Sequence, residues 1–260
     1  MEFSDIAVVV TACRRPYYLE RVLASWAAAD GIEQVGRFSI ALGESPKRDE
    51  QLALIRSMTA KIPALDVIPD SPAAVAARGM HRAIGEAATR VFTDPAVRFA
   101  VFSEEDVVVS SDALTYMLWA AGEFETSRDV LAVCAHSRGG QGWDEHKPAQ
   151  DADADQAAVR LLPYFNAWTW GTWPDRWEMM LEPAWDWNVD SGGPTTSGWD
   201  WCIETKILPR TGTKCVVPDA SRTQNIGALE GWASNEWSFS FSQAASFRES
   251  RADVEYRLAE

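Results

Sequence analysis

Three consecutive carboxylates, Glu104, Glu105 and Asp106, follow the apolar segment 99–102 after a single serine, Ser103. Adjacent carboxylates repel one another, so they are tolerated where they stay solvated or bind a cation. Mn²⁺ and Mg²⁺ take oxygen ligands and commonly bridge one or two carboxylates to the phosphates of a substrate. In an extended segment, residues two apart face the same way, so Glu104 and Asp106 are expected on one face. The plainer alternative is a solvated, charged loop before a helix.

Another carboxylate, Asp200, stands in the segment 197–201, which reads Ser-Gly-Trp-Asp-Trp. A reaction in which a hydroxyl attacks and loses its proton needs one carboxylate as general base. The spacing of Ser197 and Asp200 is also that of a capping box, where Asp200 would only stabilise a helix start and have a lowered pKa. Further candidates for the base are Asp186, Asp190 and Glu230.

The elements that must position these residues follow an alternating pattern in the first half of the chain. Runs of β-branched and other apolar residues alternate with residues at helical spacing, which predicts an α/β sheet with parallel strands. Ligands of such sheets lie beyond the carboxyl ends of the strands, where Arg15, Glu44 and the acidic triplet are expected. The predicted strands are 6–12, 38–42, 65–68, 99–102 and 130–135, and the predicted helices are 16–31, 52–58, 72–91 and 112–124.

The second half differs in composition, because 11 of the 13 tryptophans fall between Trp143 and Trp237. Tryptophan rings can stack on the apolar faces of sugars, yet most of these are expected in the core, since tryptophan buries a large area. Among the four cysteines, Cys134 and Cys215 lie in predicted strands and are expected as neighbours with free thiols.

Charge and hydropathy restrict the class of protein. The net charge is 24 − 38 = −14, which disfavours broad binding of nucleic acids or anionic membranes. The 47% hydrophobic content excludes a disordered chain. No stretch reaches the ~20 apolar residues that cross a bilayer, and the N-terminus is acidic where a signal peptide is basic. These features predict a cytoplasmic protein without a membrane partner.

The order of four features along the chain resembles the family 13 glycosyltransferases, which are mannosyl-glycoprotein N-acetylglucosaminyltransferase I-like. These features are the acidic triplet, the tryptophan-rich middle, the 197–201 motif and the segment 215–223, which reads Cys-Val-Val-Pro-Asp-Ala-Ser-Arg-Thr. The resemblance covers roughly residues 6–231. It implies the GT-A nucleotide-sugar fold, a mixed sheet flanked by helices. Residues 1–135 would form its nucleotide-sugar-binding half and residues 136–260 its Trp-rich, acceptor-side half.

The resemblance also implies a metal-dependent, inverting glycosyltransferase. Because the predicted sheet starts at residue 6, the family's membrane anchor and stem are expected to be absent, which favours a stand-alone bacterial or viral catalytic unit. It would move a sugar such as N-acetylglucosamine from a UDP-sugar to a hydroxyl of a glycan, glycoconjugate or protein. Asp106 matches the ligand of Mn²⁺ (or Mg²⁺), and Asp200 matches the general base. The matched donor contacts are Arg15 at the phosphates, Glu44 near the uracil, Glu104 and Glu105 at sugar and ribose, and Arg222 in the Ser-Arg-Thr loop.

Two local features complete these expectations. Where the family has a histidine near the base, this chain has Gly79, and His81 is the nearby substitute. The glycine-containing loop 219–231 has the composition of a mobile lid that would exclude water.

Three other functions remain open. A catalytically inactive carbohydrate- or nucleotide-binding protein would keep the tryptophans, but it has no need of both the triplet and Asp200. A nucleotidyltransferase shares such a sheet, but it usually has a glycine-rich loop after the first strand, which 11–16 lacks. A glycosyltransferase acting on a modified nucleobase in DNA is disfavoured by the negative charge.

Overall fold

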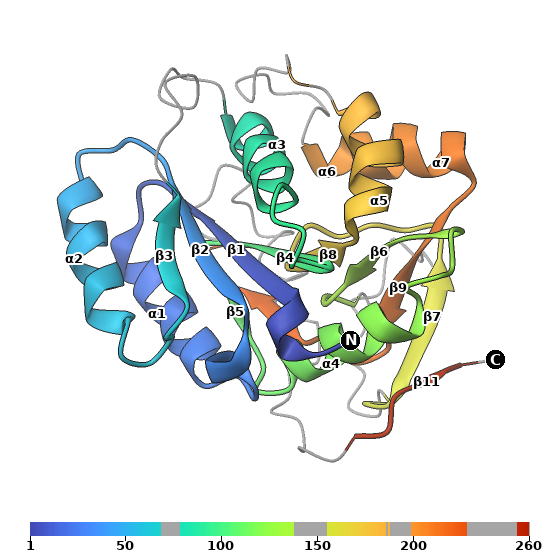
Figure 1. The fold of residues 1–260 in the computed structure, drawn as a ribbon, viewed down its shortest axis with the longest axis horizontal. Coiled ribbons are helices and arrows are strands. Elements are labelled where there is room, and N and C mark those ends of the chain that lie inside the picture. The colour runs from blue at the N-terminus through green and yellow to red at the C-terminus, as the bar shows by residue number, and fades with distance from the viewer. Residues whose placement is uncertain (69–78, 138–154, 186, 188–198, 228–253, 260) are drawn as a thin grey trace.

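The computed structural model describes residues 1–68, 79–137, 155–185, 187, 199–227 and 254–259 (Figure 1). Its strands are β1 (Ile6–Ala12), β2 (Arg37–Leu42), β3 (Leu65–Ile68), β4 (Phe99–Glu104), β5 (Val107–Val109), β6 (Val130–Cys134), β7 (Ala158–Leu162), β8 (Trp170–Thr172), β9 (Lys214–Pro218), β10 (Thr223–Asn225) and β11 (Arg257–Leu258). Its main helices are α1 (Pro16–Ala27), α2 (Arg48–Met58), α3 (Gly79–Val91), α4 (Ala113–Glu123), α5 (Pro174–Arg176), α6 (Trp199–Cys202) and α7 (Leu208–Thr211). Two π-helical turns, η3 (Trp177–Leu181) and η5 (Ile203–Ile207), continue α5 and α6.

A nine-stranded mixed sheet in the order β11-β7-β9-β6-β8-β4-β1-β2-β3 forms the centre of the molecule. The β-branched run of β1 is buried along its whole length and pairs in parallel with both β2 and β4. Strand β8 then enters antiparallel between β4 and β6, so the sheet joins the two halves of the chain. This arrangement confirms the predicted mixed α/β sheet and most of its strands. The helix expected over 72–91 is α3 over its described part, and 69–78 lie outside the described residues.

Each face of the sheet carries its own hydrophobic core. Helices α1, α2 and α4 cover one face, and α3, η3, η5 and α7 cover the other (Figure 1). Trp26, Trp170, Trp173 and Trp177 are among the largest fully buried side chains, so these tryptophans belong to the core, as expected. Trp201 differs, because 44% of it is exposed.

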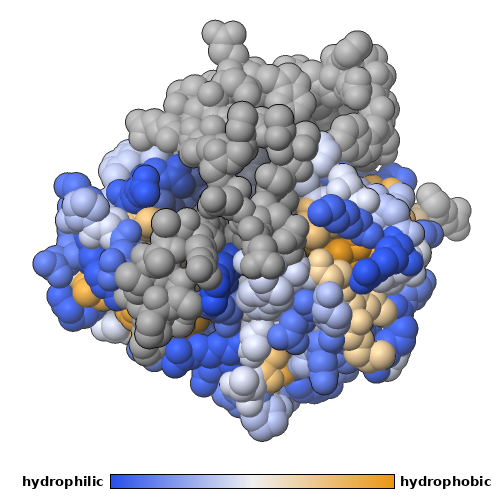
Figure 2. Space-filling view, turned by 90° about the horizontal axis from the view of Figure 1, so that it is seen from above, coloured by the Kyte–Doolittle hydropathy of each residue, from blue (hydrophilic) through white to orange (hydrophobic). Residues whose placement is uncertain are grey.

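The outer surface seen in Figure 2 is mostly hydrophilic over the described residues, with small and separate apolar spots. The large hydrophobic side chains that stand exposed are scattered: Tyr17, Met179, Trp201 and Leu258. Among the described residues, none of the helices has the length and apolar character needed to cross a membrane.

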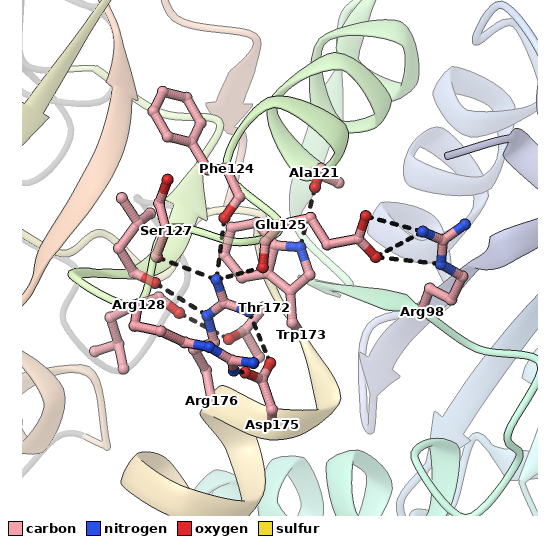
Figure 3. Close-up of polar contacts among 12 residues, drawn as sticks. Arg98, Ala121, Phe124, Glu125, Ser127, Arg128, Thr172, Trp173, Asp175 and Arg176 are labelled. Atoms are coloured by element: carbon pink, nitrogen blue, oxygen red, sulfur yellow. Dashed lines mark hydrogen bonds and ion pairs between the residues drawn. The ribbon is translucent and has the colours of Figure 1, made fainter.

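A buried arginine fixes the junction between β8 and the end of α4 (Figure 3). Arg176 Nη2 donates to the carbonyls of Phe124, Glu125 and Ser127 at 3.0, 2.8 and 3.1 Å. Its guanidinium also lies 4.3 Å from the ring centre of Trp173. Carbonyls at a helix C-terminus have no partner within the helix, and this side chain supplies one. Burial, followed by the nearby Arg128, lowers the pKa of Arg176 to about 10, so it stays charged at neutral pH.

Cys134 and Cys215 lie on the adjacent strands β6 and β9, and their thiols interact, so the prediction that they are neighbours is confirmed. All four cysteines are free thiols in the structure.

Candidate functional site

The acidic triplet lies at the carboxyl end of β4, where the chain turns. Glu104 is the last residue of the strand, Glu105 and Asp106 form the turn, and β5 follows at once. The segment between Glu104 and Asp106 is a turn and not an extended strand, so the geometric reason for placing them on one face does not hold. The two carboxylates nevertheless lie near each other, because the charge of Asp106 is the largest charge that acts on Glu104.

Glu105 holds the loop that follows β1. It is 5% exposed, and its Oε2 accepts hydrogen bonds from the backbone N–H groups of Cys13 at 2.8 Å and Arg15 at 3.4 Å. Its Oε1 accepts from Arg15 Nε at 2.9 Å. Both oxygens of Glu105 thus face the 13–15 loop, and they fix the position from which the Arg15 side chain extends.

Asp106 and Arg15 form a buried ion pair that leaves one atom of each group unsatisfied. Arg15 Nη2 lies 2.8 Å from Asp106 Oδ2. Among the described residues, Asp106 Oδ1 and Arg15 Nη1 are buried without any hydrogen-bond partner. Burial raises the pKa of Asp106, although Arg15 opposes the rise. A buried polar atom without a partner costs about 1–3 kcal/mol, so a ligand that supplies both a cation and an anion would relieve both atoms at once.

The backbone at Gly227 closes over this ion pair. A β-carbon built there would lie 2.6 Å from Asp106 Cβ and 2.8 Å from Arg15 Nη1, so only glycine fits without displacement. The Ile226 N–H donates to the carbonyl oxygen of Asp106 at 2.8 Å. Just before it, β10 pairs antiparallel with β5, and Ser221, Arg222 and Thr223 are buried. Within the described part of the expected lid, 219–227, residues 223–225 form the strand β10, which pairs with β5 in a two-stranded sheet.

Glu104 and Asp200 lie close enough to interact, although they are far apart in the sequence. Burial, followed by the charges of Asp106 and Asp200, raises the pKa of Glu104 to about 8. Burial also raises the pKa of Asp200, which its own backbone N–H and that of Trp201 oppose. The expectation of a lowered pKa at a helix start is wrong here, because burial outweighs the hydrogen bonds. A carboxylate with a raised pKa is a stronger base, as proton abstraction requires.

The raised pKa of Glu104 predicts a pH-dependent stability. The folded protein holds this proton more tightly than the unfolded chain, where the ordinary value is 4.5. The stabilisation is complete below about pH 4.5 and is lost as the pH rises through about 8. We expect Glu104→Gln to flatten this part of the Tm-against-pH curve, measured in EDTA. Glu50→Gln, on the exposed surface, is the matched control, and an unchanged slope in Glu104→Gln would contradict the assignment.

The remaining expected donor contacts are placed differently. Glu44 lies beyond the end of β2 in an open hollow of about 470 Å³, beside Ser45, Pro46 and Arg48. The carbonyl of Glu44 is 3.6 Å from the Cys13 thiol, so it belongs to the same edge of the sheet as the triplet. Arg222 is 1% exposed, and its Nε lies 2.9 Å from Asp112 Oδ2.

The rest of the Arg222 guanidinium donates to the carbonyls of Ala220 and Gln156. Arg222 therefore faces the interior.

The remaining predicted site residues lie outside the described part of the chain: Asp186, Asp190, Glu230 and the side chain of His81.

Sequence reasoning missed the hydroxyls that support the triplet. Ser103 Oγ lies 2.9 Å from Thr169 Oγ1, and its carbonyl accepts from Thr11 Oγ1 at 3.2 Å. Thr169 is fully buried and has φ = 62°, a left-handed conformation that is unusual for a β-branched residue. No local pattern marks this residue, because its partners, Ser103 and the backbone N–H of Ala135, come from elsewhere in the chain.

The residues at this edge of the sheet fit a divalent metal that takes a single carboxylate ligand from the protein. Over the described part of the chain, no group of three or more His, Cys, Asp or Glu side chains is gathered to hold a metal. Asp106, with its unsatisfied Oδ1, offers a single carboxylate. That fits Mg²⁺ or Mn²⁺ bound by one carboxylate, waters and the phosphates of a substrate.

Comparison with known proteins supports the fold. No family model matches the chain. The chain is similar to the mannosyltransferase PcManGT from Pyrobaculum calidifontis in complex with GDP-Man and Mn²⁺, with a TM-score of 0.52, 16% identity, and coverage of 82% of this chain and 54% of that one. It is also similar to a fragment of S. aureus TarS, with a TM-score of 0.54, 11% identity, and coverage of 94% and 71%.

The same TarS fragment has been solved in complex with UDP-GlcNAc, and there the TM-score is 0.51 at 13% identity, with 86% of this chain and 58% of that one covered. The chain thus spans about half of the mannosyltransferase and more of TarS. The mixed sheet, its flanking helices and these likenesses show that the chain has the GT-A fold of nucleotide-sugar glycosyltransferases.

Proposed function

We propose that the protein is a metal-dependent, inverting glycosyltransferase, related to family 13, that transfers a sugar such as N-acetylglucosamine from a UDP-sugar to an acceptor hydroxyl. The observation that carries the proposal is the unsatisfied pair at the end of β4, Asp106 Oδ1 and Arg15 Nη1. The first atom needs a cation and the second an anion, and a metal-bound diphosphate supplies both. In this proposal residues 1–135 bind the donor and residues 136–260 supply the acceptor side.

The roles of the residues follow from their surroundings. Arg15 binds the diphosphate and neutralises part of the charge that grows on it as the bond to the sugar breaks. A divalent metal on Asp106 would supply the rest of that neutralisation when bound. Glu105 keeps the 13–15 loop in place for this contact. Glu104, which carries a proton near neutral pH because its pKa is about 8, can donate a hydrogen bond to a sugar hydroxyl.

Asp200 is the proposed base. As the acceptor oxygen forms its bond to the anomeric carbon and the bond to the diphosphate breaks, the hydroxyl proton passes to the Asp200 carboxylate. A single displacement from the face opposite the leaving diphosphate inverts the anomeric centre. The proximity of Asp200 to Glu104 supports a base at the donor site.

The choice of uridine rests on two supports. The TarS fragment has been solved with UDP and with UDP-GlcNAc. Glu44 lines the hollow beyond β2, and its carbonyl contacts Cys13, two residues before Arg15, so a base could lie there when Arg15 binds the diphosphate. The mannosyltransferase was solved with GDP-Man, so the nucleotide has to be tested directly.

The test is a thermal-shift titration with UDP, GDP, ADP and CDP, each with and without Mn²⁺. A nucleotide at about 100 times its Kd stabilises the fold by about 2.7 kcal/mol, which raises Tm by about 5–10 °C for a chain of this size. We expect this rise with UDP only, in the presence of Mn²⁺, and its loss in Asp106→Ala. Glu50→Ala, on the exposed surface of α2, is the control. Absence of any metal-dependent nucleotide effect would leave a sugar-binding protein on this fold.

A further inference from the structure

We propose that Arg15 is a counter-ion gate, which keeps Asp106 closed to free divalent cations until a diphosphate draws the guanidinium away. This inference rests on the proposed function and adds an order of binding to it. The metal ion binds weakly when it is alone and tightly when the nucleotide is also bound. The protein would then not take up a free metal ion that has no substrate to activate.

The first observation is that Arg15 already neutralises the Asp106 carboxylate to which a cation would bind. Its Nη2 lies 2.8 Å from Asp106 Oδ2, beside the unsatisfied Oδ1 at which a cation would bind, and its Nε lies 2.9 Å from Glu105 Oε1. The two carboxylates are almost completely buried, with side-chain exposures of 7% and 6%. A metal ion that approaches Asp106 alone must therefore compete with a guanidinium held by two charge-assisted contacts.

The second observation is that the neighbouring 226–227 backbone holds Asp106 beside the arginine. Gly227 lies against the Asp106 side chain, and the Ile226 N–H holds the Asp106 carbonyl at 2.8 Å. The β5–β10 pairing fixes both segments. Because these contacts hold Asp106 in place, we assign the exchange of partners to movement of Arg15.

The third observation is that Arg15 is able to move. Its side chain is 26% exposed, while the two carboxylates stay inside. Its Nη1 has no partner among the described residues, so moving the guanidinium toward a ligand gives this atom a hydrogen bond that it now lacks. A diphosphate offers several anionic oxygens for the fork of an arginine, which free Mn²⁺ does not.

These observations predict a linkage that can be measured without catalysis. If diphosphate removes Arg15 from Asp106, it strengthens metal binding, and the metal strengthens diphosphate binding by the same factor. Direct contact between phosphate and metal would couple the two ligands as well. The decisive quantity is therefore the affinity for Mn²⁺ alone, where only the competition by Arg15 acts.

The experiment is a titration of the full chain with Mn²⁺, followed by electron paramagnetic resonance of the free ion. It compares the wild type, Arg15→Gln and Arg14→Gln. Arg14 carries the same charge one residue away, with an exposed side chain that makes no contact in the described structure, so its variant controls for the net charge. We expect Arg15→Gln to bind Mn²⁺ alone at least about fivefold more tightly than the wild type, and Arg14→Gln to leave it unchanged.

A second series adds saturating UDP. We expect the wild-type affinity for Mn²⁺ to rise at least about tenfold, and to rise by a smaller factor in Arg15→Gln. Should Arg15→Gln not fold, as judged by circular dichroism, Arg15→Lys carries the test. Its single ammonium cannot pair with both carboxylates in the same way, so it should also tighten the binding of Mn²⁺ alone.

The outcomes separate the gate from the proposed function. Unchanged or weaker binding of Mn²⁺ alone by Arg15→Gln, or equal tightening by Arg14→Gln, overturns the gate even if UDP binds as proposed. If UDP has no effect on any form while Arg15→Gln still tightens Mn²⁺, the gate stands and the nucleotide assignment fails. Absence of Mn²⁺ binding in every form, with UDP present, removes both.

Discussion

Replacement of Asp200 by asparagine is expected to lower kcat by about 10²–10⁴-fold, which is the usual contribution of a general base. Asparagine keeps the shape of the side chain but cannot accept the hydroxyl proton. Binding of UDP with Mn²⁺ should remain near the wild-type value, because the proposed donor contacts lie at the ends of β1 and β4. The measurement is transfer from UDP-N-acetylglucosamine to an acceptor found by screening, or to water, followed as release of UDP.

The pH profile gives a second reading of the same variant. Because burial raises the pKa of Asp200, the wild-type rate should rise with pH as the carboxylate loses its proton. In Asp200→Asn that limb should disappear. Glu204→Gln, which changes a partly buried carboxylate one helical turn further on, is the matched control and should keep both the rate and the profile. Full activity of Asp200→Asn, with loss of activity in Asp106→Ala, would move the base to another residue.

The sequence predicts most of the sheet because long buried strands can be recognised from the composition of the strand itself. Strand β1 reads as a short run rich in β-branched residues, and burial on both faces is the reason for that composition. The position of the triplet follows from the same logic, since the end of a parallel strand is where ligands bind. Strand β8 is different. It has three residues and lies antiparallel between β4 and β6, and no local pattern specifies partners so distant in the chain.

The site is less predictable because its properties depend on partners from elsewhere in the chain. The Asp200 carboxyl has a raised pKa through burial, which the helix-start spacing around it does not reveal. The 219–227 segment has the glycine and polar composition of a lid, but its residues 223–225 pair with the three residues of β5. The role of Glu105 depends on the backbone of the 13–15 loop, which a carboxylate triplet does not indicate by itself.

Arg222 shows how far apart such partners can lie. In the Ser-Arg-Thr segment it reads as a donor contact, yet its guanidinium pairs with Asp112, 110 residues earlier in the chain. Each residue is 1% exposed. Asp112 also accepts from Ser110 Oγ at 2.6 Å and from the Tyr256 hydroxyl at 3.0 Å. This group of contacts joins α4, the 220–222 segment and the described C-terminal residues, so we infer that it holds the fold together.

Asp112→Ala is therefore expected to destabilise the protein by about 3–5 kcal/mol, because it leaves the Arg222 charge buried without a counter-ion. Urea unfolding measures this difference. The control is Glu50→Ala, which breaks the exposed pair with Lys47, where the two side chains are 57% and 58% exposed. Such a surface pair contributes about 0–1 kcal/mol, so that variant should unfold near the wild-type midpoint.

A replacement on the other side of the pair separates a structural role from donor binding. Arg222→Met should cost a similar free energy of unfolding, since it leaves Asp112 ionised in the interior. The double variant Asp112→Asn with Arg222→Met should cost less than the sum of the two changes, because it removes both charges together. At a temperature where it remains folded, Arg222→Met should bind UDP with Mn²⁺ as the wild type does. Wild-type stability combined with lost UDP binding would instead place Arg222 at the donor, and the buried pair with Asp112 would then be the resting position of a side chain that turns outward.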